Sequence, residues 1–407
     1  MKICGIIAEY NPFHKGHKYH IEETKKITGA DKIAVIMSGN YVQRGEPAII
    51  DKWTRTKMAL LNGADIVIEL PCVYSSSSAE FFAFSSVKIL NSIGADYLCF
   101  GSENTNLEQM YSIAKLLCNE TKEYRLILKN ELDKGLVFPA ARTNALKNCL
   151  GIDSSLLDTP NNILGVEYIK ALIKLNSSIK PFTILRNTAG YHCTDISGNI
   201  ASAHAIRLAL KNNSINDIER VMPKNAFNIF NSALKNNSAP AVYDNFSTIL
   251  QYKLRTLDLK TLSKFLDINE GLENRIFEAC YNNFLISEII DAVKTKRYAY
   301  TKLQRALLHI LLDITKEDFE NFNSNGFCQY IRVLGFKRES KDLLSFITRK
   351  SPLPVIINPK KDFSKLSPLG IKMFEKEISA TEIYFLALPN FKSKIGKQEF
   401  IQPVVVV

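Results

Sequence analysis

The sequence has no long apolar run. No segment approaches the roughly 20 apolar residues of a membrane-spanning helix, and residues 1–17 lack the apolar core and small-residue cleavage site of a signal peptide. We therefore expect a soluble, cytoplasmic protein with no membrane span. Low-complexity segments and internal repeats are also missing, which favours an ordinary globular fold.

Cysteines are present but never closely spaced. The eight cysteines stand at positions 4, 72, 99, 118, 149, 193, 280 and 328. No two of them form a Cys-x-x-Cys pair, which argues against a zinc site or a dithiol redox motif. We expect reduced and mostly buried thiols.

The chain is long and basic. Its 407 residues exceed what one hydrophobic core usually organises, so we expect a main domain and at least one more domain or subdomain. Lysine and arginine number 52 against 41 acidic residues, and the net charge of +11 favours an anionic partner such as nucleic acid.

Short β-rich runs alternate with amphipathic stretches in the first half of the chain. The β-rich runs are Ile3–Ala8, Lys32–Ser38, 66–69, 97–100 and 181–185, and helical patterns follow residue 17 and cover 51–62, 80–93 and 162–175. This alternation predicts an α/β fold with a doubly wound, mostly parallel sheet and helices on both faces.

The second half has a different pattern. Residues 202–323 are largely helical in periodicity. They are followed by a helical pattern at 341–347, by β-rich runs at 355–357 and 382–388, and by a terminal run at 404–407 that predicts a strand at a sheet edge. We predict a catalytic domain over residues 1–215 and a mostly helical domain with a C-terminal α/β portion over residues 216–407.

The segment EYNPFHKGH follows the first predicted strand, and ligands of open α/β sheets bind beyond the carboxyl ends of the strands. Its Asn-Pro pair predicts a turn, and Gly16 lets the backbone approach a ligand. His17 starts a helix whose free N–H groups favour phosphate, so His14 and His17 would face one anion-binding space. Such groups suit phosphoryl or nucleotidyl transfer, which depends on positioning and charge stabilisation.

Two other interpretations of these histidines stay open from the residues alone. They could be surface residues of a turn and a helix, or His14, His17 and His20 could bind a metal. No carboxylate or cysteine accompanies them at ligand spacing, so we predict no metal site.

These residues carry a family resemblance. The segment AEYNPFHKGH at 8–17 resembles the His-x-Gly-His signature of nucleotidylyltransferases and class I aminoacyl-tRNA synthetases. Further segments narrow the match to the bacterial tRNA(Met) cytidine acetate ligase family, which most of the chain resembles in order. They are MSGNYVQRGEP at 37–47, KWTR at 52–55, IELP at 68–71, FGSE at 100–103, NNILG at 161–165, AGYH at 189–192 and the stretch 294–305.

The resemblance implies a two-step reaction. Acetate and ATP would give acetyl-adenylate and pyrophosphate, with Mg²⁺ accompanying ATP. The acetyl group would then pass to N4 of the wobble cytidine (position 34) of elongator tRNA(Met), forming N4-acetylcytidine. The fold would be a nucleotidylyltransferase-like Rossmann fold, and His14 and His17 would be catalytic.

The resemblance also implies a set of ATP-binding residues. These are Ile7, Ala8, Glu9, Tyr10, Asn11, Pro12, Phe13, His14, Lys15, Gly16, His17, Lys18, Tyr19, His20, Gly101, Asn162 and Arg186. Three of them also have simpler explanations, because Gly101 fits a turn, Asn162 fits a helix cap, and Arg186 fits a solvated charge at a strand end.

Two further segments are candidates near the phosphates. SAHAIR at 202–207 resembles the superfamily's second phosphate motif and offers Ser202 and Arg207, although His204 stands where many relatives have a hydroxyl residue. The alternative for Ser202 is a plain helix N-cap. In the loop at 39–46, Gln43 and Arg44 are candidates for holding acetate or pyrophosphate, and an exposed loop is the alternative.

A basic, aromatic stretch predicts a tRNA contact. Its cations are Lys294, Lys296, Arg297, Lys302 and Arg305, interleaved with Tyr298 and Tyr300 and without an acidic residue. A solvated charged face is the alternative. The segment 332–338 is a weaker extension of this surface.

Two other functions remain in competition. A small-molecule adenylyltransferase of cofactor biosynthesis would use the same His-x-Gly-His core, but such enzymes are usually much shorter. An RNA-binding protein with a decayed nucleotide domain is disfavoured because His14, Gly16, His17 and Arg186 are intact. Oligomeric state is left open by the sequence.

Overall fold

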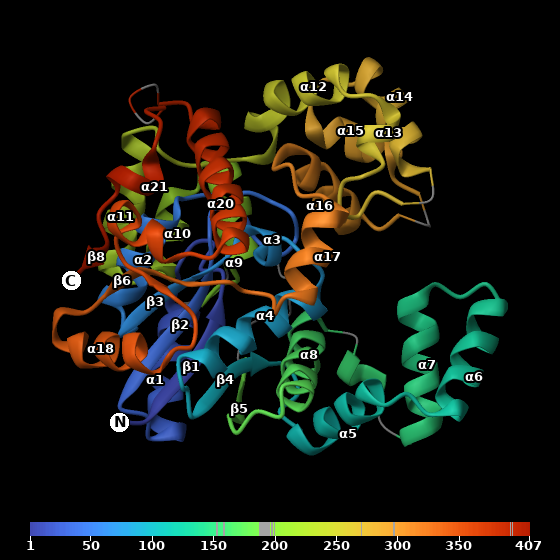
Figure 1. Cartoon of the computed structure of the whole chain (residues 1–407), viewed down its shortest axis with the longest axis horizontal. Coiled ribbons are helices and arrows are strands. Elements are labelled where there is room, and N and C mark those ends of the chain that lie inside the picture. Colours follow the sequence, from blue (N-terminus) through green and yellow to red (C-terminus); the bar gives the residue numbers. More distant parts are fainter. Residues whose placement is uncertain are drawn as a thin grey trace.

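The computed structural model describes residues 1–407 except 152, 153, 158, 187–195, 197, 199, 270, 296, 297, 391 and 393. A mostly parallel sheet forms its centre, with helices on both faces (Figure 1). The predicted α/β class is therefore confirmed. No helix in the described part of the chain is long and apolar enough to cross a membrane.

The sheet has the strand order β5-β4-β1-β2-β3-β6-β7, with β8 also paired to β6. The strands β1 to β5 are parallel to one another, β6 is antiparallel to β3, and β7 and β8 are parallel to β6. Their bounds are β1 Ile3–Ala8, β2 Lys32–Ser38, β3 Ile66–Leu70, β4 Tyr97–Ser102, β5 Lys180–Leu185, β6 Ile331–Phe336, β7 Val355–Ile356 and β8 Val405–Val406.

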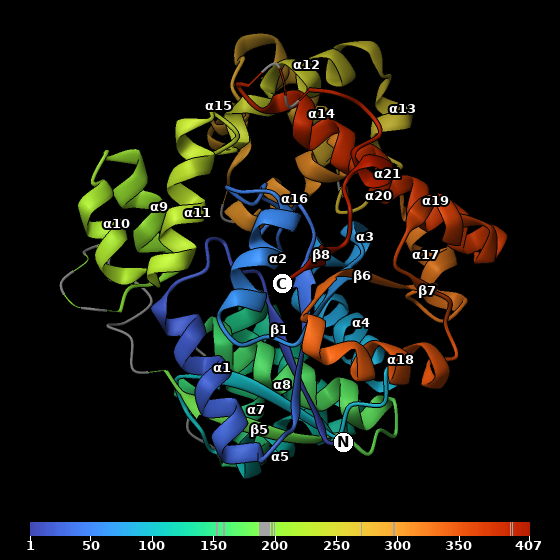
Figure 2. The same cartoon turned by 90° about the vertical axis from the view of Figure 1, so that its left-hand side faces the viewer.

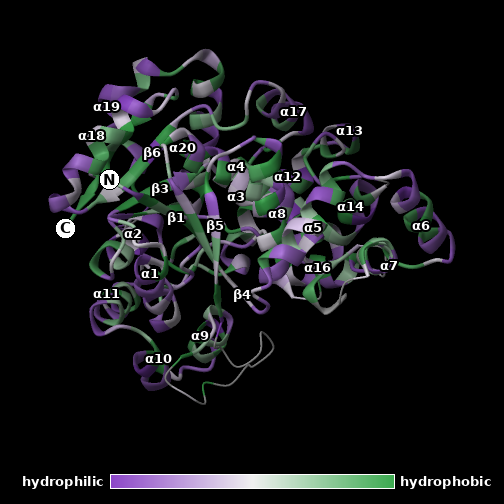
Figure 3. Cartoon of the chain, turned by 90° about the horizontal axis from the view of Figure 1, so that it is seen from below, coloured by the Kyte–Doolittle hydropathy of each residue, from purple (hydrophilic) through white to green (hydrophobic). Residues whose placement is uncertain are grey.

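Alternate residues of the strands enter two separate cores. On β2, Ala34 and Ile36 pack on one face, whereas Ile33, Val35 and Met37 pack on the other. Because successive side chains of a strand point to opposite faces, a strand buried on both sides must be apolar throughout. The strands β3 and β6 are accordingly coloured mainly as hydrophobic in Figure 3.

The helices of the N-terminal half connect the parallel strands. They are α1 Lys15–Thr28, α2 Lys52–Leu61, α3 Cys72–Ser75, α4 Ala79–Ser92, α5 Leu107–Cys118, α6 Lys122–Asp133, α7 Phe138–Leu150 and α8 Pro160–Lys174. The buried Ile21 of α1 and Met58, Ala59 and Leu60 of α2 join one core. Buried apolar residues of α4 and α8 join the other, together with Trp53 of α2. The sheet is therefore covered on both faces, as a doubly wound fold requires.

The chain from residue 203 to residue 324 is helical, as predicted. Its helices are α9 Ala203–Lys211, α10 Ile215–Val221, α11 Lys224–Lys235, α12 Ser247–Thr256, α13 Leu259–Leu262, α14 Leu272–Asn282, α15 Ile286–Val293, α16 Tyr300–Leu311 and α17 Lys316–Ser324. Figure 2 shows α9 to α11 grouped on one side of the molecule and α12 to α15 gathered at one end.

The C-terminal segment returns to the central sheet. Its helices are α18 Lys341–Lys350, α19 Pro359–Asp362, α20 Pro368–Ala387 and α21 Gln398–Ile401, and its strands β6 to β8 extend the sheet beyond β3. The predicted helix near 341 and edge strand near 404 are confirmed. The division at residue 215 stays a prediction, and strands from both sides of it share one sheet.

One sequence prediction in this region is wrong. Residues 382–388 were expected to be β-rich, but residues up to 387 belong to α20. Phe374, Glu377, Thr381, Tyr384 and Phe385 of α20 are buried. Their spacing of three and four residues is that of one helix face, which outweighs the local β propensity.

The described cysteines are free thiols. Cys4, Cys72, Cys99, Cys280 and Cys328 are buried, and Cys118 and Cys149 are partly buried. The expectation of mostly buried, reduced thiols is confirmed for this set, and Cys193 lies outside the described residues.

Candidate active site

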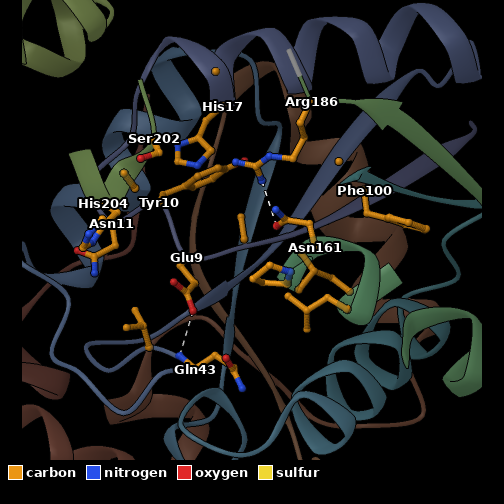
Figure 4. Close-up of a pocket in the computed structure, with 18 of the residues that line it drawn as sticks. Glu9, Tyr10, Asn11, His17, Gln43, Phe100, Asn161, Arg186, Ser202 and His204 are labelled. Carbon is orange, nitrogen blue, oxygen red and sulfur yellow. Dashed lines mark hydrogen bonds between the residues drawn. The ribbon is translucent and has the colours of Figure 1, made fainter. Parts of the chain in front are cut away.

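A cavity of about 470 Å³ opens beyond the carboxyl ends of β1, β4 and β5 (Figure 4). The sequence-predicted residues that line it are Ile7, Ala8, Glu9, Tyr10, Asn11, His14, Gly16, His17, Tyr19, His20, Gln43, Arg44, Gly101, Arg186, Ser202, Arg207 and Arg305. Pro12, Phe13, Lys15, Lys18, Asn162, Lys294 and Lys302 do not line it. The fold therefore brings residues from distant parts of the chain to the place where an α/β sheet binds its ligands.

His14 and His17 form a closed unit at the start of α1. Nδ1 of His14, the N-cap, accepts a hydrogen bond from the Gly16 backbone N at 3.1 Å, and Nδ1 of His17 accepts one from the His14 backbone N at 3.3 Å. The two rings stack with centroids 3.7 Å apart. This reciprocal capping explains the spacing of His-x-Gly-His, because the second histidine stands at the third helical position.

The capping bonds also assign the protons of both imidazoles. A neutral ring whose Nδ1 accepts a hydrogen bond carries its proton on Nε2, so each ring has an Nε2–H donor. Burial and the nearby Arg186 and Arg207 guanidinium groups lower the pKa of His14 to about 3. Burial and the His14 ring lower the pKa of His17 well below its usual range. Both rings are therefore neutral donors near pH 7.

Gly16 is needed for this geometry. A Cβ on residue 16 would lie 2.9 Å from Cε1 and 3.0 Å from Nδ1 of His14. A side chain there would displace the ring that caps the helix. The glycine of the motif thus makes room for His14, in addition to any close approach of a ligand.

Arg186 reaches the cavity from the end of β5. Its Nη1 donates to Oδ1 of Asn161 at 3.2 Å, and Nδ2 of Asn161 donates to the Glu103 carboxylate. Figure 4 shows Arg186 and Asn161 pointing toward each other. The alternative of a solvated strand-end charge does not hold, because a side-chain partner fixes the guanidinium at the cavity.

Asn162 has a different place from the one expected. It lies inside α8, and Thr159 is the N-cap. Its Oδ1 accepts from the backbone N atoms of Glu103 and Asn104 at 3.0 and 3.2 Å. Asn162 therefore holds the loop after β4, and its neighbour Asn161 lines the cavity.

Glu9 and Gln43 connect the first two strand ends. Oε1 of Glu9 accepts from the Gln43 backbone N at 3.0 Å, and Nε2 of Gln43 donates to the Ser77 carbonyl at 3.1 Å. Burial raises the pKa of Glu9. The loop at 39–46 is accordingly a fixed wall of the cavity.

The segment 202–207 also lines the cavity. Ser202 is the N-cap of α9, and its Oγ accepts from the Ala205 backbone N at 3.0 Å. The N-cap alternative is thus realised, at a helix start that faces the cavity. Nη1 of Arg207 donates to the Asn11 carbonyl at 2.8 Å, so this arginine stabilises the loop after β1.

The motif KWTR lies beneath the cavity. Arg55 donates to the carbonyls of Glu9, Ser38 and Gly39, which fixes both strand-end loops. Lys52 is buried, and its ammonium group forms ion pairs with three carboxylates, those of Glu69, Glu377 and Glu399. In the segment 332–338, Arg332 is 1% exposed and pairs with Glu399, so the weaker extension of the RNA surface is wrong at this residue.

These three glutamates form the one group of potential metal ligands in the described part of the chain. The Lys52 ammonium occupies their centre, with Nζ 2.6 Å from Oε1 of Glu69. A cation is therefore already supplied by the protein itself. The cluster is structural, and it joins α2 and β3 to α20 and α21.

The residues of the basic stretch 294–305 lie in different places in the structure. Lys294 and Lys302 lie outside the cavity, each with Nζ 5.6 Å from the centre of a tyrosine ring, Tyr300 and Tyr298 respectively. Arg305 instead lines the cavity, and its Nε donates to Asp267 at 3.0 Å. Lys296, Arg297 and the segment AGYH at 189–192 lie outside the described residues.

Sequence reasoning missed several cavity residues. Asn161 belonged to a quoted motif, but the choice between the two adjacent asparagines needed the helix phase. Phe82, Phe100 and Tyr168 supply apolar walls, and Thr301 comes from α16. An apolar residue on a buried helix face gives no signal that separates a cavity wall from the core.

Fold and site together define a nucleotidyl transfer domain with a His-x-Gly-His centre. The chain matches the family model described as HIGH Nucleotidyl Transferase over residues 1–399. It is 43% identical over 408 residues to the tRNA(Met) cytidine acetate ligase of Thermoanaerobacter sp. (strain X514) and 40% identical over 415 residues to that of Acetivibrio thermocellus, with 100% of each chain covered.

A solved structure agrees with these relatives. The Thermotoga maritima TmcAL, bound with alpha-thio ATP, has a TM-score of 0.92 and 31% sequence identity to this chain, and all of both chains is covered. The chain belongs to the tRNA(Met) cytidine acetate ligase family.

Proposed function

We propose that this protein is an ATP-dependent ligase that acetylates N4 of the wobble cytidine (position 34) of elongator tRNA(Met). Acetate attacks the α-phosphate of ATP, acetyl-adenylate forms and pyrophosphate leaves. The cytidine amine then takes the acetyl group and AMP leaves. The names of the full-length relatives support the substrates.

The observation that carries the proposal is the pair of neutral imidazoles at the N-terminus of α1. Their Nε2–H groups and the free N–H groups of the helix are suited to the negative charge that grows on the α-phosphate. A neutral donor held by the backbone needs no reorganisation as that charge develops, which is how preorganised sites lower barriers. Arg186 and the N-terminus of α9 supply further positive potential for the phosphates.

Mg²⁺ belongs to this proposal as the counter-ion of ATP. Among the described lining residues the carboxylates are Glu9 and Glu46, and Glu9 is buried with a raised pKa. Such a lining does not make an all-protein cage for Mg²⁺. The ion would be bound through the phosphates and water, as Mg²⁺ usually is with ATP.

The tRNA partner is supported by charge and by aromatic residues. The net charge is +11. Lys294 is exposed, and Tyr300 beside it is 38% exposed. Cations for phosphates and rings for unstacked bases are what single-stranded RNA loops require.

The test incubates the purified chain with ATP, Mg²⁺, labelled acetate and a tRNA(Met) transcript, followed by mass spectrometry of the nucleosides. We expect labelled N4-acetylcytidine, and none with a transcript carrying uridine at position 34. Acetate-dependent exchange of pyrophosphate into ATP reports the first step alone. Exchange that needs a nucleotide-like acceptor in place of acetate would instead support the small-molecule adenylyltransferase.

A further inference from the structure

The second step of the proposed reaction has a chemical requirement that the histidine pair does not meet. The lone pair of the cytidine N4 is delocalised into the ring, so this amine is a weak nucleophile. It must lose a proton as it attacks the acetyl carbonyl. General-base help of this kind comes from a group within hydrogen-bond reach of the proton.

The described cavity lining offers two carboxylates for this task, Glu9 and Glu46. Glu9 already accepts the Gln43 backbone N through Oε1. Burial also raises its pKa, which favours the protonated form that cannot accept a proton. Glu46 is therefore the remaining carboxylate of the described lining for this role.

Glu46 is held in place by the helical half of the chain. Its Oε1 accepts from Nε2 of Gln304 at 2.7 Å, and the Gln304 carbonyl accepts from the Tyr243 hydroxyl at 2.6 Å. Its backbone carbonyl accepts from the Val42 N at 2.9 Å, which closes the loop. A Cβ on Gly45 would lie 2.5 Å from the Arg305 backbone N, so this loop packs directly against α16.

The surroundings of Glu46 connect the adenylation site with the basic, aromatic stretch. Burial is the main cause of the raised pKa values of Glu9, Tyr243 and Tyr300, and the nearby Glu46 charge adds to each of them, on one side at Glu9 and on the other at the two tyrosines. Tyr300 carries the Lys294 ammonium over its ring. The carboxylate thus lies between the place where acetyl-adenylate would form and the surface where an RNA loop would arrive.

We propose that Glu46 receives the N4 amino group of the incoming cytidine and acts as the general base for acetyl transfer. This inference rests on the proposed function. A carboxylate that accepts from N4 of cytosine also distinguishes cytosine from uracil, which presents an acceptor at that position. One residue would therefore serve both base selection and catalysis.

The step balances without a further reactant. N4 forms a bond to the acetyl carbon, and the bond between that carbon and the phosphate oxygen breaks with its electron pair. AMP leaves as the anion. One proton of N4 passes to the Glu46 carboxylate and then to solvent.

Glu46→Gln tests this role, because its amide oxygen can still accept from Gln304. The first readout is acetyl-adenylate, trapped as acetohydroxamate with hydroxylamine, which attacks without help from Glu46. The second is single-turnover transfer to saturating tRNA. We expect hydroxamate formation within about twofold of the parent enzyme and transfer reduced about 100-fold or more. The exposed Glu108→Gln is the matched control, with both readouts normal.

Other results would overturn the inference. Normal transfer in Glu46→Gln removes the proposed base, and selective loss of transfer in Glu9→Gln assigns the role to the other carboxylate. Equal loss of hydroxamate and transfer in folded Glu46→Gln places the residue in adenylation. Failure of the parent enzyme to form any hydroxamate from acetate refutes the proposed function itself, which is a separate outcome.

Discussion

The side chain of Arg186 lies directly over Gly101. A Cβ on residue 101 would be 3.1 Å from Cγ and 3.4 Å from Cδ of Arg186. The end of β4 thus has no side chain at the place where the arginine crosses from β5 to Asn161. The two residues are 85 positions apart, and their contact places the guanidinium at the cavity.

Gly101→Ala should therefore weaken ATP use by moving Arg186. We expect a loss of about 10- to 100-fold in kcat/KM for ATP, because a charge-assisted contact of this type contributes about 1.5–3 kcal/mol. Pyrophosphate exchange at varied ATP measures it. Gly370→Ala is the control, since its new Cβ would meet side-chain atoms no closer than 3.3 Å. Normal ATP kinetics in Gly101→Ala would show that Arg186 adapts without cost.

His14→Asn should separate the capping role from the chemical role. Asparagine is one of the preferred N-cap residues of a helix. Alanine at that position lowers the free energy of unfolding by about 0.5–2 kcal/mol. We expect His14→Asn to unfold near the parent's urea midpoint and His14→Ala to unfold earlier. Both should lose acetate-dependent exchange by about 100-fold or more, because neither has an Nε2–H donor. Full activity in His14→Asn would show that His14 has only a structural role as the helix cap.

Some parts of this site could be predicted from the sequence, and others could not. The strand-turn-helix at EYNPFHKGH was predictable, because turn residues and periodicity are local signals. It was not predictable that Asn161, and not Asn162, lines the cavity, because this depends on how α8 is rotated about its axis. The contact of Lys52 with Glu377 and Glu399 spans more than 300 residues, and nothing local in the sequence indicates it. The sheet likewise recruits β6 from far downstream.

His20 should make stability depend on pH. Burial and the Arg186 charge lower its pKa from 6.5 to about 4, so the unfolded chain binds its proton more readily. Stability from a neutral buried histidine is complete above the unfolded pKa and is lost as pH falls toward the folded pKa. We expect the free energy of unfolding to drop less between pH 7.5 and pH 5.0 in His20→Gln than in the parent. Equal drops in urea titrations would contradict this.

Lys52 should contribute strongly to the stability of the fold. It is fully buried and faces Glu69, Glu377 and Glu399, while Arg332 pairs with Glu399 from the other side. Lys52→Met leaves buried carboxylates without their cation, which typically costs about 3–5 kcal/mol. Urea unfolding at pH 7 measures the loss, with exposed Lys57→Met as control. Adding Glu399→Gln should restore part of it, and no rescue would mean that packing dominates.

Charge removal at the basic stretch should affect transfer and leave adenylation intact. Lys294 and Lys302 lie outside the cavity, whereas Arg305 lines it and is therefore unsuited to this test. Lys294→Ala and Lys302→Ala, and separately Lys296→Ala with Arg297→Ala, should weaken tRNA binding. The slope of log Kd against log salt should fall by about 0.7–0.9 for each phosphate group that the variant no longer binds. Acetate-dependent pyrophosphate exchange should stay normal, because the histidine pair and its helix are untouched.

If exchange falls together with transfer in folded variants, the stretch supports the catalytic half structurally. If neither changes, the tRNA is bound elsewhere and these basic residues form only a solvated face.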